Sequence, residues 1–286
     1  MGIATYENIA VNHMVNAFKA RSTFEYQEAF EYYPGVIQNR VYYKVSRETS
    51  WELNDSRSVF YDSDRKFLGQ KGDVFLSQHS PFPSVPIIHP WINYNFGGHA
   101  AINNGNNRFI EAVGFPGPGE TILDFIFHPG DQPHDFTATV NVTNTNYWLN
   151  PNFRYDNHPD YPFYGSYYRN EFFGVRVKDI TMDQIDGAVD YANDKVDKNL
   201  YNFTFFLDLK HKYYCTDLVS RAYQSVMLDE RDQRLYARAL NDDRFITSVN
   251  DIILSQDTYL IFYVEITNGD IHIYYLEDLE EQAWNT

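Results

Sequence analysis

The chain has 286 residues and a formal net charge of −16, because 23 Lys and Arg stand against 39 Asp and Glu. This length suits one large domain or two small ones, and the contents of 43% hydrophobic and 17% aromatic residues exclude a disordered chain. The acidic balance argues against a nucleic-acid partner, since phosphate backbones are bound by clustered Lys and Arg. The single cysteine excludes internal disulfides and multi-cysteine zinc sites.

The sequence is compatible with more than one cellular compartment. No stretch approaches the roughly 18 consecutive apolar residues that would predict a transmembrane segment. The first residues, MGIATYENIAVNHMVNAF, lack the basic start and the unbroken apolar run of a secretory signal. A bacterial envelope or secreted location would fit if a signal had been removed, and a cytoplasmic one would fit otherwise.

The first 68 residues are expected to form a partly helical N-terminal extension. The spacing of apolar residues predicts helices over 13–20 and 24–32, and Pro34-Gly35 ends that segment. Residues 36–66 are rich in Tyr and Ser and are expected to form short strands and turns.

The remaining residues, 69–286, are expected to form the main domain. A strand is predicted over 71–77, and after a proline-rich bridge two strands, 99–102 and 108–113, flank an Asn-Gly turn and form a β-hairpin. Further along, Thr181 and Gln184 form a capping box that opens an amphipathic helix. The other elements expected in this half are a strand over 172–177, helices over 182–197, 215–226 and 231–240, and strands over 252–254, 260–264 and 271–275, the last two joined by Asn268-Gly269.

Residues 128–170 are rich in Asn, Tyr, Pro and Asp and are expected to form a surface insertion with one hairpin over 137–142. Its aromatic residues could line a groove, but packing of the insertion onto the domain is favoured, since aromatic side chains bury much apolar area. These residues are Tyr147, Trp148, Phe153, Tyr155, Tyr161, Phe163 and Tyr164.

No metal or organic cofactor is expected. The insertion contains residue types that bind metals, but their spacing matches no defined motif. They are His128, His134 and His158 with Asp131, Asp135 and Asp160.

Cys215 is the residue most suggestive of chemistry. Apolar residues at 218, 219, 222, 223 and 226 predict a buried helix that begins at or just after this cysteine. A helix start carries unpaired N–H groups and partial positive charge, which stabilise a thiolate, the form that attacks carbonyl carbon. The alternative is that Cys215 packs as a small buried hydrophobic residue, as most free cysteines do.

A nucleophilic thiolate needs a base, and His99 is the strongest candidate. It follows two glycines, which leave the imidazole accessible, and it begins the first strand of the predicted hairpin. Glu111 lies on the second strand, so pairing would bring its carboxylate near His99 to accept an imidazole N–H. The alternatives are a surface histidine at a strand end and a solvated charge.

These segments together resemble the circularly permuted NlpC-type, papain-like cysteine peptidases and amidases, the YiiX-like group. The resemblance lies in the order of Gly72-Asp73-Val74, Gly98-His99-Ala100-Ala101-Ile102, Ile110-Glu111-Ala112-Val113-Gly114 and Tyr213-Tyr214-Cys215-Thr216-Asp217-Leu218-Val219. In that group the histidine strand precedes the cysteine helix. The resemblance covers roughly residues 70–265, apart from the insertion.

The resemblance implies an α+β, papain-like fold in which an antiparallel sheet packs on the cysteine-bearing helix. It assigns Cys215 as nucleophile, His99 as base and Glu111 as the third member, with Tyr201 or Tyr214 near the oxyanion. The implied activity is hydrolysis of an amide bond in a peptide, an isopeptide or a peptidoglycan fragment. An acyltransferase or lipid amidohydrolase with the same Cys-His pair, acting on an acylated small molecule, is one alternative. A non-catalytic module that binds glycan or protein is another.

Overall fold

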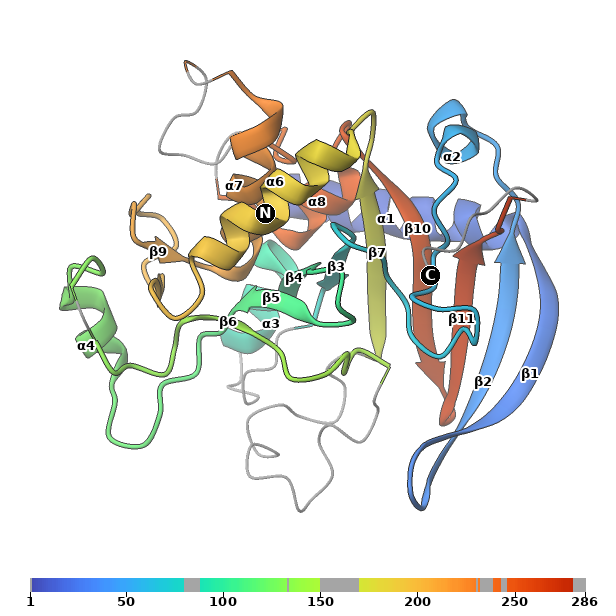
Figure 1. The fold of residues 1–286 in the computed structure, drawn as a ribbon, viewed down its shortest axis with the longest axis horizontal. Helices are drawn as coiled ribbons and strands as arrows, with labels where there is room; N and C mark the ends of the chain where they lie inside the picture. The colour runs from blue at the N-terminus through green and yellow to red at the C-terminus, as the bar shows by residue number, and fades with distance from the viewer. Residues whose placement is uncertain are drawn as a thin grey trace.

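The computed structural model describes residues 2–79, 88–132, 134–149, 170–229, 231, 239–242 and 246–279. Within these residues, the main structure is a nine-stranded sheet with the strand order β1-β2-β11-β10-β7-β3-β4-β5-β6 (Figure 1). The strands are β1 (Ser22–Tyr33), β2 (Val36–Val45), β3 (Val74–Ser77), β4 (His99–Asn103), β5 (Phe109–Ala112), β6 (Val140–Val142), β7 (Glu171–Val177), β10 (Thr258–Thr267) and β11 (Asp270–Leu276), and β8 (Leu200–Tyr201) pairs with β9 (Lys212–Tyr213) in a separate two-stranded sheet.

The helices gather mainly at the side of the sheet where β3, β4 and β5 lie (Figure 1). The helix α7 packs against β4, β5 and α6, while α8 packs against β3 and β10, and α1 packs against α8 and α3. The helices are α1 (Gly2–Ala20), α2 (Ser50–Asn54), α3 (Ile88–Phe96), α4 (Ile122–Phe127), α6 (Met182–Asp194), α7 (Cys215–Met227) and α8 (Val249–Leu254).

The sheet is mixed, which corrects the expectation of an antiparallel sheet. Strand β2 pairs with β11 in parallel, whereas the other adjacent pairs of the large sheet are antiparallel. A parallel pair requires a long crossover rather than a tight turn, and here the whole of the chain between β2 and β11 forms that crossover. The β1–β2 hairpin of the N-terminal extension is therefore continuous with the sheet of the main domain.

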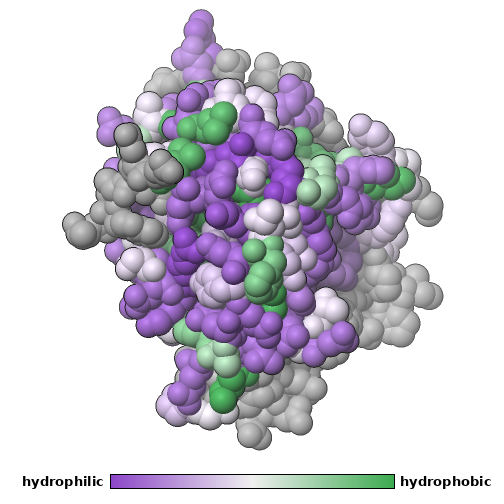
Figure 2. All heavy atoms as spheres, turned by 90° about the vertical axis from the view of Figure 1, so that its right-hand side faces the viewer, coloured by the Kyte–Doolittle hydropathy of each residue, from purple (hydrophilic) through white to green (hydrophobic). Residues whose placement is uncertain are grey.

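The helix predicted over 24–32 is wrong, because these residues form β1. The strand folds back through the turn after Tyr33 and pairs with β2 along its length. Across this pair, the rings of Tyr26 and Tyr42 stack with centroids 4.4 Å apart. Cross-strand aromatic pairs stabilise a sheet, and sequence spacing within one segment cannot reveal such a partner. Over the β1–β2 end of the molecule the surface is largely hydrophilic (Figure 2).

The strand predicted over 252–254 is also wrong. This short apolar run lies in the helix α8, which begins after Ser248. The Ser248 side chain accepts a hydrogen bond from the Asp251 amide, and the Asp251 carboxylate accepts one from the Ser248 amide. Apolar runs this short do not distinguish a strand from a buried helix, and here the capping box decides.

In the insertion, the expected hairpin over 137–142 is replaced by a single edge strand, β6, which pairs with β5. The helix predicted over 231–240 falls largely on residues 232–238, which lie outside the described residues, whereas Ala239 and Leu240 form a turn. Residues 36–66, expected to form short strands and turns, instead contain the ten-residue strand β2 and the helix α2. The helix predicted over 13–20 is confirmed as part of α1. The strands predicted in the main domain from 71 to 275, apart from 252–254, and the helices that begin after Thr181 and at Cys215 are also confirmed, including both hairpins.

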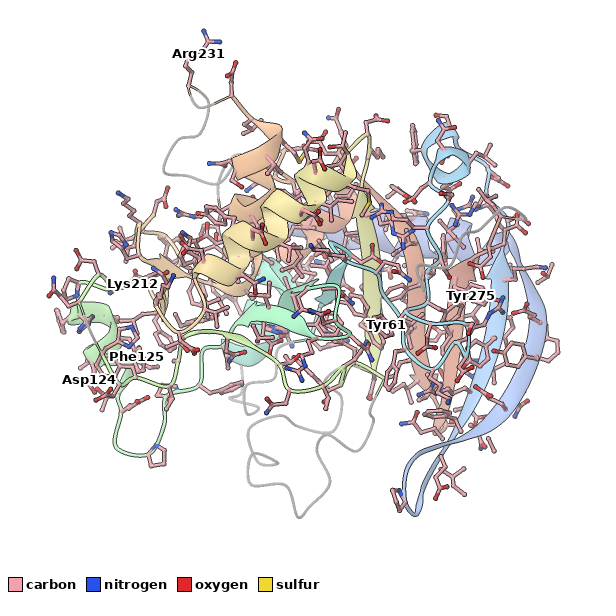
Figure 3. The ribbon with its side chains drawn as sticks, in the orientation of Figure 1. Tyr61, Asp124, Phe125, Lys212, Arg231 and Tyr275 are labelled. Atoms are coloured by element: carbon pink, nitrogen blue, oxygen red, sulfur yellow. The ribbon has the colours of Figure 1, made fainter. Side chains whose placement is uncertain are left out.

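The small β8–β9 sheet is tied to α4 by a buried lysine. Lys212 donates hydrogen bonds from Nζ to the carbonyl oxygens of Phe125, at 2.6 Å, and Ile126, at 3.1 Å. Phe125 and Lys212 lie together at the end of the molecule opposite Tyr275 of β11 (Figure 3). Removal from water lowers the pKa of Lys212, since burial disfavours the charged form. This contact holds in place the segment that leads from Tyr201 to Cys215.

A buried ion pair joins the middle of the sheet to the N-terminal extension. Arg176 of β7 is 1% exposed, and its guanidinium contacts Asp73 at 2.7 Å and Asp55 at 3.2 Å. The Arg176 and Arg57 guanidinium groups hold the pKa of Asp55 well below its ordinary value, although burial alone would raise it. Fully paired in this way, the charges can remain inside the protein, whereas an unpaired one would be costly.

Removing one partner should therefore destabilise the fold. We expect Asp73→Asn to lower the free energy of unfolding by about 3 kcal/mol, because the Arg176 charge would stay buried with less compensation. Urea denaturation followed by circular dichroism measures this change. Lys198→Ala, which removes an exposed ion pair with Asp194, is the control and should change stability by less than about 0.5 kcal/mol. Equal effects of the two variants would contradict the assignment.

Candidate active site

Cys215 is the first residue of α7, and Tyr214 is the N-cap. The Tyr214 backbone is extended, with φ −94° and ψ 168°, so the helix starts abruptly at the cysteine. The amide groups of a first helical turn have no partner within the helix and carry partial positive charge. Cys215 is 9% exposed and packs within the hydrophobic core. The thiol thus lies at a positive helix end and is shielded from bulk water.

His99 and Glu111 come together through the register of the β4–β5 hairpin. Ile102 pairs with Ile110, and continuing this register places Ala101 opposite Glu111. His99, two residues before Ala101, points to the same face, where a long side chain can reach it diagonally. The structure joins the two directly, because Nε2 of His99 lies 2.8 Å from Oε2 of Glu111.

This hydrogen bond determines what the imidazole can do. Both side chains are buried, with 8% of His99 and 6% of Glu111 exposed. A carboxylate accepts, so Nε2 carries the hydrogen and Nδ1 is the basic nitrogen of the neutral ring. An oriented imidazole of this kind is what a general base requires.

Two residues from the insertion complete the surroundings of this pair. The Tyr147 hydroxyl donates a hydrogen bond to Oε2 of Glu111 at 2.5 Å. The Trp148 ring stacks on the His99 ring with centroids 6.0 Å apart and an interplanar angle of 17°. Tyr147 and Trp148 are both buried, so for these two the favoured expectation of packing is confirmed. Their contacts with His99 and Glu111 were not anticipated, because they arise only when residues 147–148 fold back over the hairpin.

An apolar cleft of about 760 Å³ opens at the cysteine. Its wall includes Cys215 and Thr216 of α7 together with Gly97 and Gly98, which lead directly into His99. It therefore brings the cysteine and the start of the histidine strand to one cavity. Most of the remaining wall is aromatic or aliphatic: Trp91, Phe96, Tyr201, Phe205, Phe206, Tyr214 and Ile246.

Tyr201 and Tyr214 both line this cleft. Burial, together with the nearby Cys215 and Tyr214, raises the pKa of Tyr201, so its phenol keeps its proton and can donate it in a hydrogen bond. The Tyr201 ring lies against Gly114, where a Cβ would come within 2.7 Å of it. The Tyr214 hydroxyl instead accepts a hydrogen bond from the Thr247 amide at 3.1 Å, which anchors the N-cap.

The described residues hold no group of three or more His, Cys, Asp or Glu side chains arranged to bind a metal ion. His158 and Asp160 of the insertion, and the aromatic residues from Phe153 to Tyr164, lie outside the described residues. Within the described part of the chain, none of the helices has the length and apolar character needed to cross a bilayer.

Comparisons with known proteins give one family and one solved structure. None of the curated proteins matches the chain. The crystal structure of the metalloprotein yiiX from Escherichia coli O157:H7 aligns at 13% identity with a TM-score of 0.38, over 67% of this chain and 96% of that one. Residues 168–260 match the model of the permuted papain-like amidase enzymes, the YaeF/YiiX or C92 family.

The matched segment runs from the residues before β7 to β10 and contains α6 and α7. It includes Cys215, whereas His99 and Glu111 precede it. The resemblance to the permuted papain-like amidases, drawn from the order of sequence motifs, is confirmed, and residues 168–260 of this chain carry the pattern of that family.

Proposed function

We propose that this protein is a cysteine-dependent amidase that cleaves an amide bond through an acyl-enzyme. The observation that carries the proposal is that one cleft is lined both by Cys215, at the start of α7, and by the Gly97-Gly98 turn that leads into His99. The hydrogen bond from His99 to Glu111 supplies the orienting partner that a catalytic imidazole needs. The family matched by residues 168–260 consists of amidase enzymes.

In the proposed reaction, His99 takes the Cys215 proton and Sγ attacks the carbonyl carbon of the amide. The oxyanion of the tetrahedral intermediate accepts hydrogen bonds from the Cys215 amide and the Tyr201 hydroxyl. The C–N bond then breaks, and the departing amine takes the proton from His99. Water, deprotonated by His99, attacks the thioester, which releases the carboxylic acid and restores the thiol.

A second candidate is cleavage or transfer of a fatty acyl group by the same residues. It is favoured by the aromatic lining of the cleft, which suits an apolar chain better than a polar peptide. In that case the acyl chain would occupy the cleft, and either water or an acceptor amine would take it from Cys215. A module that only binds glycan or protein would not need a reactive thiol.

The reactivity of the single thiol tests the Cys-His pair. We expect Cys215 to react with iodoacetamide at pH 6 at least about tenfold faster than a small free thiol, because a neighbouring imidazole stabilises the thiolate. His99→Ala should abolish this advantage, and the rate is measured by mass spectrometry of the labelled protein. His13→Ala, at an exposed position on α1, is the control. A thiol as slow in the wild type as in His99→Ala would favour the binding module.

The role of Tyr147 can be tested by removing only its hydroxyl group. Tyr147→Phe deletes the hydrogen bond to Glu111 and should lower the free energy of unfolding by about 1 kcal/mol. If Glu111 orients His99, Cys215 of the variant should also be alkylated several-fold more slowly at pH 6. At this pH the thiol ionises only with the help of a correctly oriented His99 imidazole. Restoring a fast reaction at higher pH, where the thiol ionises unaided, would support this role. An unchanged alkylation rate at pH 6 would restrict Tyr147 to packing.

The length of the acyl group distinguishes the two candidate substrates. If the cleft holds an apolar chain, kcat/KM for N-acyl anilides should rise by about fourfold for each methylene added between acetyl and hexanoyl. Trp91→Ala should flatten this dependence, since Trp91 lines the cleft. Trp51→Ala, which removes a tryptophan from a different surface pocket, should not. A kcat/KM that does not change with chain length would contradict acyl binding in the cleft.

A further inference from the structure

A smaller pocket, with room for a small chemical group, adjoins the cleft at Cys215. The two cavities share part of their walls, including Phe205, Phe206 and Tyr214. The smaller one differs from the apolar cleft because it also contains charged side chains, contributed by Asp208, Asp217 and Arg221. A substrate bound at Cys215 therefore has a polar cavity directly beside it.

The three charged residues form a chain in which the acidic groups outnumber the basic one. Arg221 of α7 donates from Nε to Oδ1 of Asp217 at 2.8 Å, and its terminal amino group donates to Oδ1 of Asp208. The side chains of Asp208 and Asp217 are 5% and 4% exposed. Two carboxylates against one guanidinium leave one negative charge uncompensated among these three groups.

The second oxygen of each carboxylate, Oδ2, does not take part in these contacts with Arg221. None of the described residues donates a hydrogen bond to Oδ2 of Asp208 or to Oδ2 of Asp217, although both atoms are buried. Buried carboxylate oxygens are normally paired, because an unpaired one loses its hydration without replacement. Burial accordingly raises the pKa of both groups, that of Asp217 to about 6. Both residues line the pocket, so a cation with N–H donors is the kind of ligand whose charge would complement these carboxylates.

We propose that the pocket between Asp208 and Asp217 binds a protonated amine of the substrate. The proposal deepens the proposed function, on which it rests, by adding a positive group close to the amide bond that is cleaved. Asp217 belongs to the first turn of α7, which begins at Cys215, and Tyr214 lies in the walls of both the pocket and the cleft. The aromatic rings of Phe205, Phe206 and Tyr214 in the wall also suit a cation, through the negative faces of their π-systems.

The loop between β8 and Asp208 forms one wall of the pocket and is held by Asn202. The Asn202 amide group donates to the Leu207 carbonyl oxygen at 2.9 Å, and its Oδ1 accepts from the Thr204 amide at 3.0 Å. Asp208 therefore follows a loop closed by side-chain hydrogen bonds and is positioned before any ligand arrives. Such preorganisation reduces the cost of binding a charged group.

The single thiol allows the pocket to be tested with charged reagents. Methyl, 2-aminoethyl and 2-sulfonatoethyl methanethiosulfonate would be reacted with the protein at pH 6, and each rate divided by the rate with a small free thiol. We expect the ammonium reagent to be favoured about tenfold over the neutral methyl reagent, with the sulfonate reagent slowest, because a charged N–H donor pairs with a buried carboxylate. Asp208→Asn should remove most of this preference.

A control variant separates the effect of the pocket on the reagent preference from the effect of the overall charge of the protein. This net charge is −16 and attracts any cation. Asp194→Asn changes the net charge by the same amount at an exposed site on α6 and should keep the preference. Equal normalised rates for the ammonium and neutral reagents, or a preference that survives Asp208→Asn, would overturn the proposal. The neutral reagent separately reports on the Cys-His pair, so slow labelling by it would count against the proposed function and leave the charge preference readable.

If circular dichroism shows that Asp208→Asn is unfolded, a further reagent tests the proposal on the wild-type protein. The trimethylammonium analogue of the aminoethyl reagent has the same charge without N–H donors. If the orphan oxygens bind an amine by hydrogen bonds, this analogue should lose most of the preference. Equal rates for the two cationic reagents would overturn the role of the hydrogen bonds and with it the proposal.

Discussion

The packing of α7 against the β4–β5 hairpin is the constraint on which the candidate site depends. The helix start supplies the positive end at Cys215, and the hairpin register brings His99 to Glu111. Neither part by itself would line the cleft with both the cysteine and the residues that lead into His99. Because α7 is buried over most of its length, the cysteine cannot shift relative to the hairpin without disturbing the core.

Around this contact the protein uses buried charge in two different ways. In the middle of the sheet, Arg176 and Arg57 stand against Asp73 and Asp55, so two positive groups balance two carboxylates and the group serves the fold. Beside the cleft, Arg221 meets Asp208 and Asp217, and two carboxylate oxygens stay without a donor among the described residues. A protein tolerates such an imbalance at a binding site, where a ligand can complete it.

The N-terminal extension and the insertion add strands at opposite edges of the large sheet. The extension adds the β1–β2 hairpin to the far edge of the sheet through a parallel pairing with β11. The insertion supplies β6 at the other edge, and its Tyr147 and Trp148 cover Glu111 and His99. The insertion, which follows the hairpin in the chain, therefore helps to bury the imidazole.

The sequence by itself determined those elements that depend on residues close to one another in the chain. Capping residues fixed the start of α6, an Asn-Gly turn joined β4 to β5, and apolar spacing placed Cys215 at the start of a buried helix. The motif order then pointed to the family that residues 168–260 match. What depended on distant partners was decided only by the tertiary structure. Residues 24–32 form a strand because Tyr26 stacks on Tyr42, and Trp148 meets His99 because the insertion folds over the hairpin. The pocket at Asp208 and Asp217 likewise exists only after the loop from β8 packs beside α7, because a cavity is enclosed by residues that no short sequence window contains.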